Sequence, residues 1–212
     1  MNIKTGYLTI KDESETRLEI ERSVFIARIA RAETGEEAAG IINRIKLLER
    51  EATHNCSAYV IGGDSGLQKT DDDGEPSGTA GRPILEAIKR SGLTDCVIVV
   101  TRYYGGIKLG AGGLIRAYSS AAKGVIDAAG VVERVLYTIF RFEADYSLLK
   151  SIETVFERSG FIITGRVYSD RVTIETAVKV GDEEKFRDIL SEITSGSVLP
   201  EEIKKVYIDH QL

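Results

Sequence analysis

The sequence predicts an α+β protein of two domains, in which the second has the ferredoxin-like order βαββαβ. Its 212 residues suffice for one or two domains with a sizeable core. Strand-like and helix-like periods alternate along the chain, and the pattern restarts between Val132 and Leu136 without a long linker. After this restart the periods follow the order strand, helix, strand, strand, helix, strand. We therefore predict domains over residues 1–135 and 136–212.

The elements of the first domain follow from the spacing of its apolar residues. Alternation of polar and apolar residues over 17–21 indicates a half-buried strand, and the apolar run at 97–100 indicates a buried one. Helical spacing places Ile41, Ile45 and Leu48 on one face, after acidic residues that suit the helix dipole. The expected elements are strands over 6–13, 16–21 and 23–30, a helix over 35–51, a strand over 55–61, a polar loop over 62–77, a short helix around 84–88, a strand over 96–101 and a helix over 113–129.

The second domain repeats the same two periods within about 75 residues. Alternation indicates its first strand, and the next segment places Leu149, Ile152 and Phe156 on one helical face. A tight turn at Ser169 and Asp170 separates two further strands. The expected elements are a strand over 137–143, a helix over 146–159, strands over 161–168 and 171–180, a helix over 182–194 and a last strand within 198–209.

Composition and charge exclude several classes of protein. The net charge of −5 argues against a nucleic-acid binder that is basic throughout, although it leaves room for a local basic surface. No apolar run approaches the roughly 20 residues that cross a bilayer, and the N-terminus has no apolar core like that of a signal peptide. Two cysteines make no disulfide framework. We therefore expect a cytoplasmic protein that has no membrane partner.

Two glycine-rich clusters, over 71–83 and 101–120, dominate the first domain. The second lies in a stretch, 96–126, that contains no Asp or Glu. Glycine amides beside a helix N-terminus form a natural anion site, arginine binds phosphate through two hydrogen bonds, and tyrosine stacks on bases. The candidate nucleic-acid or anion site comprises Arg102, Tyr103, Tyr104, Gly105, Gly106, Lys108, Gly110, Gly112, Gly113 and Arg116.

Known phosphate-binding motifs do not fit this second cluster. A P-loop would need Lys followed by Ser or Thr where Ala111 and Gly112 stand, and a dinucleotide fingerprint would need Gly or Ala at Ile115. The alternative interpretation is structural: the glycines serve a turn and close helix packing, while the charged side chains are simply solvated.

The first cluster begins with three consecutive aspartates. Carboxylates suit magnesium or calcium, but the complete calcium-loop pattern with its terminal glutamate is missing. We predict that these carboxylates hold the loop through hydrogen bonds to backbone amides and bind no metal. The residues of this loop-structuring motif are Asp72, Asp73, Glu75, Ser77, Thr79 and Arg82.

The remaining reactive side chains give no catalytic pattern. His54 and Cys56 would face the same side of a strand, yet no cluster of four ligands accompanies them. A packing role is favoured because cysteine usually behaves as a small buried hydrophobe. No serine has the Gly-x-Ser-x-Gly frame of a hydrolase. We therefore predict no catalytic residue and no cofactor, and the sequence leaves open whether the protein is an enzyme.

Both glycine-rich clusters together resemble the signature of the IMPACT/YigZ family. The matching segments are 23–26, 52–56, 72–81 and 101–118, so the resemblance spans about 23–122, and 137–212 resembles the C-terminal domain of bacterial YigZ-type members. The resemblance implies a first domain like domain 2 of ribosomal protein S-five and a second like the last domain of the translocation elongation factor. Because both folds recur in translation proteins, it also implies contact with RNA or the ribosome.

We therefore expect a translation-associated protein that binds RNA or a ribosomal particle through the glycine-rich basic surface of its first domain. Two alternatives stay open: an enzyme or binding protein for a phosphorylated small molecule at the same surface, and a regulator that binds a protein partner. Eukaryotic IMPACT restrains a translation-control kinase through an additional N-terminal module. We expect no such module here, so the kinase role is not carried over.

Overall fold

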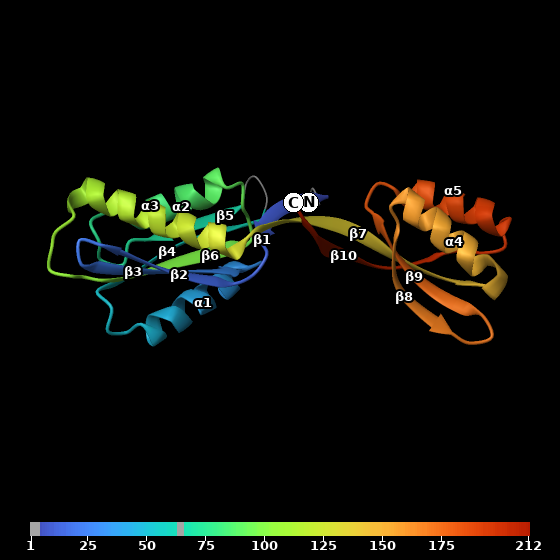
Figure 1. Ribbon diagram of the computed structural model, residues 1–212, viewed down its shortest axis with the longest axis horizontal. Coiled ribbons are helices and arrows are strands. Elements are labelled where there is room, and N and C mark those ends of the chain that lie inside the picture. Colours follow the sequence, from blue (N-terminus) through green and yellow to red (C-terminus); the bar gives the residue numbers. More distant parts are fainter. Residues whose placement is uncertain (1–4, 63–65) are drawn as a thin grey trace. The chain divides into compact units, whose positions relative to one another are not determined.

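The computed structural model describes residues 5–62 and 66–212, which form two compact units (Figure 1). The first unit comprises Tyr7–Glu133 with His210–Leu212, and the second comprises Arg134–Asp209 with residues 5–6. This is the mixed α+β, two-domain class that the sequence predicts. Because each unit also takes a short segment from the opposite end of the chain, the ranges 1–135 and 136–212 stay a prediction.

The first unit contains an antiparallel sheet of five strands. Their order across the sheet is β2 (Ser14–Ile20), β3 (Ser23–Arg31), β6 (Cys96–Tyr103), β4 (His54–Ile61) and β5 (Leu67–Asp71). A two-residue turn at Glu21 and Arg22 joins β2 to β3, and both residues have positive φ, as tight hairpins require. The sheet places β6 at its centre, which is why this strand is buried along almost its whole length.

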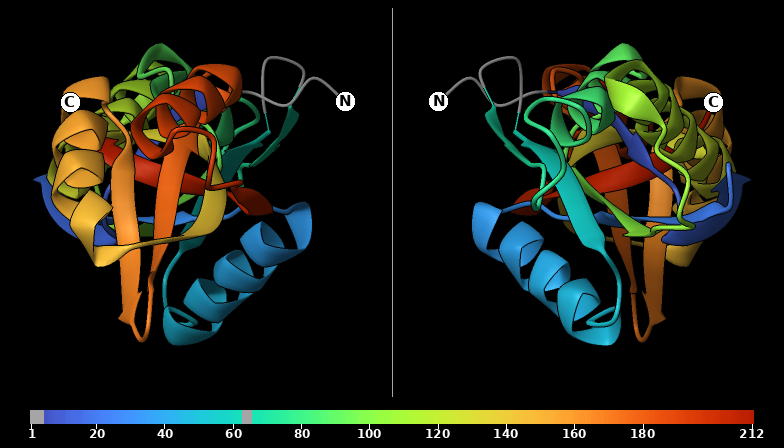
Figure 2. Two further views of the ribbon diagram at one scale, coloured as in Figure 1. Left: turned by 90° about the vertical axis from the view of Figure 1, so that its right-hand side faces the viewer. Right: turned by 90° about the vertical axis from the view of Figure 1, so that its left-hand side faces the viewer.

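Helices cover both faces of this sheet (Figure 1, Figure 2). On one face α1 (Gly35–Leu48) begins where the Thr34 hydroxyl accepts from the amide of Glu37, and it packs on the sheet through Ala38 and Ile45. On the other face lie α2 (Gly81–Arg90) and α3 (Gly110–Ala129). We call this pair of helices the α2/α3 layer.

The second unit has helices on one face of its sheet (Figure 1). Its elements are β7 (Val131–Ala144), α4 (Tyr146–Ser159), β8 (Ile162–Tyr168), β9 (Val172–Lys179), α5 (Glu183–Thr194) and β10 (Glu201–Gln211). Across the sheet they lie in the order β10, β7, β9 and β8, and β1 (Gly6–Ile10) also pairs with β7. Phe140, Phe156 and Phe186 form the centre of the core. In the described part of the chain we find no helix that would qualify as a membrane span.

The strand expected over 6–13 and the helix expected over 35–51 end three residues early, at Ile10 and Leu48. Three further expectations about the elements were also wrong. The polar loop expected over 62–77 contains the edge strand β5, whose five residues are all exposed and so lack the apolar alternation of a half-buried strand; residues 63–65 of that loop lie outside the described residues. Helix α3 begins at Gly110 instead of 113, because its first turn is built from the glycines of the second cluster. Strand β7 begins at Val131 instead of 137 and contributes residues to both units.

Candidate functional site

A buried ion pair joins the two glycine-rich clusters at the centre of the first unit. The Arg102 guanidinium donates to the Glu75 carboxylate at 2.7 Å, and these side chains are only 6% and 3% exposed. The Tyr118 hydroxyl donates to the same carboxylate oxygen at 2.8 Å, and His54 Nε2 lies 3.9 Å from the other oxygen. Buried charges persist only when they are paired in this way, because removing them from water is costly.

Aromatic rings enclose the Arg102 side chain. Its Cζ atom lies 5.4 Å from the centre of the Phe25 ring and 5.3 Å from that of Tyr104, within the range of cation–π attraction. Nη2 donates to the Ser23 hydroxyl at 3.2 Å, while Nε has no partner among the described residues. The structure therefore places Arg102 in the interior, facing Glu75, and not on the surface with the other cations of the candidate site.

The aspartates of the first cluster accept hydrogen bonds from the backbone around them. Asp72 accepts from the amides of Gly78, Ala80 and Gly81 at 2.7, 3.0 and 2.8 Å, which fixes the turn that leads into α2. Asp73 accepts from the amide of Asn55 at 2.6 Å through one oxygen. Its other oxygen accepts from Lys46 at 2.7 Å, and Lys46 also donates to Asp71. Nearby bonds thus occupy the carboxylate oxygens that a metal would need.

The other members of the loop-structuring motif have different surroundings. Glu75 bonds to side chains and not to the backbone amides. The Thr79 hydroxyl donates to the carbonyl oxygen of Pro76 at 2.6 Å, and the N-cap of α2 is Ala80. Ser77 is exposed, and Arg82 lies exposed on α2. Among the residues that the structure describes, no group of three or more His, Cys, Asp or Glu side chains is placed to hold a metal ion.

We expect Asp72→Asn to lower the free energy of unfolding by about 1–2 kcal/mol, because the charge that strengthens three amide hydrogen bonds is lost. Urea unfolding followed by circular dichroism measures this. The exposed neighbour Ser77 provides the control: the stability of Ser77→Ala should stay within about 0.5 kcal/mol of the wild type.

The same loop is expected to bind no metal ion with micromolar affinity. Calorimetric titration with magnesium or calcium measures this. Specific binding that Asp73→Ala abolishes would contradict our account of the loop.

His54 and Cys56 have packing roles. Cys56 is buried, and its sulfur lies 3.0 Å from the carbonyl oxygen of Asp72 and 3.3 Å from the Tyr118 hydroxyl, so its one S–H can donate to either. Burial raises the pKa of the Cys56 thiol to about 12, so it stays protonated at neutral pH. His54 Nδ1 lies 2.8 Å from the carbonyl oxygen of Asp73. These contacts agree with the packing interpretation, since catalysis or zinc binding by cysteine needs the thiolate.

The glycines of the second cluster are partly explained by local packing. A Cβ atom at Gly105 would lie 2.0 Å from the carbonyl oxygen of Arg22, so the loop packs directly on the β2–β3 turn. Gly106 has a φ of +88°, which side chains disfavour, and nothing lies near a Cβ built there. Gly110, Gly112 and Gly113 form the first turn of α3. The structural alternative therefore accounts for Gly105 fully and for Gly106 in part.

The exposed cations of the second cluster lie together. Lys108 and Arg116 are exposed and line one hollow of about 350 Å³, which Gly113 and the hairpin residue Glu21 also border. Tyr104 is 44% exposed. By contrast, Tyr103 is half-buried, and its hydroxyl donates to Glu49 at 2.6 Å. Of the predicted site, the structure thus brings together Lys108, Arg116 and the first turn of α3.

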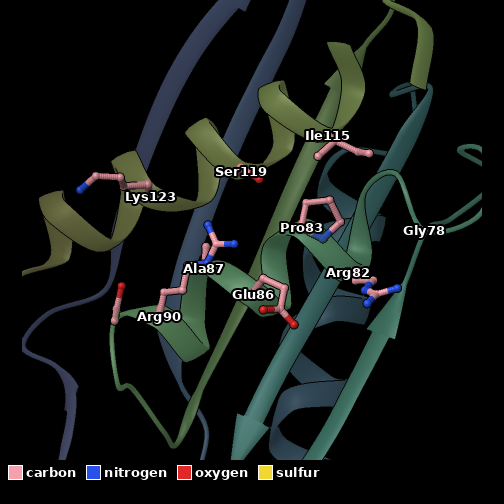
Figure 3. Close-up of a pocket in the computed structure, with 10 residues that line it drawn as sticks. Gly78, Arg82, Pro83, Glu86, Ala87, Arg90, Ile115, Ser119 and Lys123 are labelled. Carbon is pink, nitrogen blue, oxygen red and sulfur yellow. The ribbon is translucent and has the colours of Figure 1, made fainter. Parts of the chain in front are cut away.

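A second group of cations, which the sequence did not predict to lie together, is found on the same layer. Arg82, Arg90 and Lys123 line a groove of about 630 Å³ between α2 and α3 (Figure 3). Positions 82, 86 and 90, and likewise 115, 119 and 123, are spaced by four residues and so share a helix face. This four-residue spacing was the feature of the sequence that could have indicated the groove. The exposed basic residues of the α2/α3 layer and its loop are Arg82, Lys89, Arg90, Lys108, Arg116 and Lys123.

Comparison with known proteins gives consistent matches along the chain. Residues 21–126 match the model described as the Impact N-terminal domain, and residues 142–197 match a domain of unknown function, DUF1949. IMPACT family member YvyE of Bacillus subtilis is 45% identical over 204 residues, covering 96% of this chain and 94% of that protein. YigZ of Escherichia coli is 31% identical over 182 residues, covering 85% and 89%. A crystal structure of a hypothetical protein, 29% identical, superposes with a TM-score of 0.63 over 95% of this chain and 99% of that one.

Proposed function

The chain belongs to the IMPACT family, and from this premise we propose that it binds RNA or a ribosomal particle through the α2/α3 layer. One observation carries the proposal: six basic side chains are exposed on α2, on α3 and on the loop that leads into α3, in a protein whose net charge is −5. Phosphate groups are the general ligands of such surfaces. Because the whole protein is acidic, the layer attracts a polyanion only at contact range, within a Debye length of about 8–10 Å.

The hollow beside α3 supplies the proposed phosphate contacts. Lys108 and Arg116 border it, and the N-terminal turn of α3, which carries a partial positive charge, lies next to them. Tyr104 offers an exposed ring on which a base can stack. Arg102 has no part in this contact because it is committed to Glu75.

The fold supports a translation-associated role. In the second unit the strand order β10, β7, β9, β8 and the element order βαββαβ favour assignment to the ferredoxin-like fold. For the first unit we propose the fold of domain 2 of ribosomal protein S-five. Both folds recur among translation proteins, which is an argument by analogy. A cytoplasmic location is part of this proposal.

We expect Lys108→Ala combined with Arg116→Ala to weaken RNA binding and to reduce the salt dependence of log K by about 1.4–1.8, since two phosphate contacts of about 0.7–0.9 each are lost. Filter binding of bulk RNA and of ribosomal subunits at several salt concentrations measures both quantities. Tyr104→Ala should cost about 1–3 kcal/mol of binding and leave the salt dependence unchanged.

The matched control changes the same amount of charge on the opposite face of the sheet. Arg44 and Arg50 are exposed on and just after α1, so replacing both by alanine should leave RNA binding nearly unchanged. Equal losses in the two double variants would show that net charge alone governs binding and would contradict the proposed site. A wild-type protein that binds no RNA at about 50 mM salt would contradict the function itself.

A further inference from the structure

We infer that the groove between α2 and α3 binds a small organic phosphate with an apolar body, at a site distinct from the RNA contact proposed at Lys108 and Arg116. At about 630 Å³ its size falls within the roughly 300–1,000 Å³ of small-molecule sites. All of its lining residues come from α2, α3, the turn before α2 and Ser91 just after α2, so the site belongs to the first unit alone.

The groove has an apolar part. Pro83, Ala87 and Ile115 line it, and Ile115 remains 43% exposed although it projects from the same helix that buries Leu114 and Ala117 in the core. Figure 3 shows Ile115 and Pro83 on facing helices, with Ala87 one turn further along α2. An apolar or aromatic ring placed here would remove the exposed surface of Ile115 and Ala87 from water, which is the usual driving force for occupying such a pocket.

The side chain of one cation, Arg90, is directed into the groove. In Figure 3 Arg90 turns its guanidinium toward α3 and beside Ala87, whereas Arg82 and Glu86 extend away from α3. Arg90 forms no ion pair within the described ranges 5–62 and 66–212, while Glu86 lies 4.0 Å from Lys89. On the facing helix Ser119 adds a hydroxyl. An arginine fork with a neighbouring hydroxyl suits a phosphate group, which arginine binds through two parallel hydrogen bonds.

These two parts together define the ligand class. Inorganic phosphate would leave the apolar surface in water, and a neutral ring would leave Arg90 without an anion. A nucleic-acid backbone is bound through several phosphates along a track, whereas of the three cations that line this groove only Arg90 is directed toward the facing helix, and Lys123 is paired with Asp127. A single phosphate attached to an apolar body satisfies both parts.

Calorimetric titration of the full chain with naphthyl phosphate, inorganic phosphate and naphthol tests the inference. Naphthyl phosphate should bind saturably and at least about tenfold more tightly than either of the other two. Arg90→Met should weaken its binding about tenfold, through the loss of a charge-assisted contact. Ser119→Trp should abolish binding by filling the groove. Arg44→Met removes the same charge from α1 and should change nothing.

Several results would overturn the inference. These are equal affinity for inorganic phosphate, no saturable binding of naphthyl phosphate, or binding unaffected by Arg90→Met in a variant whose circular dichroism matches the wild type. A short single-stranded RNA that binds more tightly than naphthyl phosphate and is equally lost in Ser119→Trp would assign the groove to RNA instead. Lys108→Ala with Arg116→Ala should leave naphthyl phosphate binding intact, so this inference and the proposed function fail or succeed separately.

Discussion

Arg102→Met is expected to lower the free energy of unfolding by about 3–5 kcal/mol, because it leaves the carboxylate of Glu75 buried without its cation. Glu75 is 3% exposed and cannot recover water without opening the packing of Phe25 and Tyr118 around it. Methionine keeps much of the volume of arginine, so the expected loss reports mainly the charge and its hydrogen bonds and not a cavity.

Urea denaturation of Arg102→Met measures this loss, with Lys123→Met as the control. Lys123 pairs with Asp127 at 2.8 Å, but these side chains are 73% and 62% exposed, and exposed pairs contribute little. The control should therefore change stability by less than about 1 kcal/mol. The double variant Arg102→Met with Glu75→Gln should be more stable than the sum of the two single losses implies, because the single changes share one interaction. Purely additive losses would contradict the ion-pair account.

Gly105→Ala is expected to cost about 2–4 kcal/mol of stability. A methyl group at this position would lie 2.0 Å from the carbonyl oxygen and 2.1 Å from the carbonyl carbon of Arg22. Both of these are backbone atoms, so no rotation of a side chain relieves the contact, and the loop must move away from the β2–β3 turn. Thermal and urea unfolding of the variant measure the effect.

Variants at two further glycines distinguish the effect of a steric contact on stability from the effect of an unfavourable backbone conformation. Gly106→Ala meets nothing within 4 Å but has a φ of +88°, so we expect a loss of about 1 kcal/mol. Gly112 lies in α3, where an added Cβ would meet only Arg116 Nη1, at 3.7 Å, so Gly112→Ala should raise stability by about 0.5–1 kcal/mol. If all three variants lost the same amount, the close approach at Gly105 would not be the cause of its effect.

Apolar periodicity predicted those elements that bury one face. Helix α1 lies within its expected range, and β2 overlaps the strand expected over 16–21 but begins earlier, at Ser14, because each of these elements alternates between a more buried and a more exposed side. Strand β5 was not predicted, because it lies at the edge of the sheet and all five of its residues are exposed. Its sequence carries the periodicity of neither a strand nor a helix.

Arg102 shows why the candidate site was predicted only in part. Near the end of an apolar run, an arginine followed by tyrosines and glycines indicates a surface cation of the same kind as Lys108 and Arg116. Strand β6, however, lies at the centre of a sheet with helices on both faces, so a charge within it must find a buried partner. That partner, Glu75, is 27 residues away in a different loop, and only the fold brings the two together.

The pairing of β1 with β7 also constrains how the protein is made. Strand β1 ends at Ile10, but the strand with which it pairs begins only at Val131. Next to this pair, the backbone amide of Lys11 donates to the carbonyl oxygen of Gly130. At about 5–20 residues per second, the N-terminal strand waits roughly ten seconds on the translating ribosome before its partner is synthesised. A nascent chain that stopped before Val131 would leave one edge of β1 without its partner strand, and the apolar cluster that contains Ile10 would lack Val131. Folding of the first unit therefore finishes only after synthesis has advanced into the second.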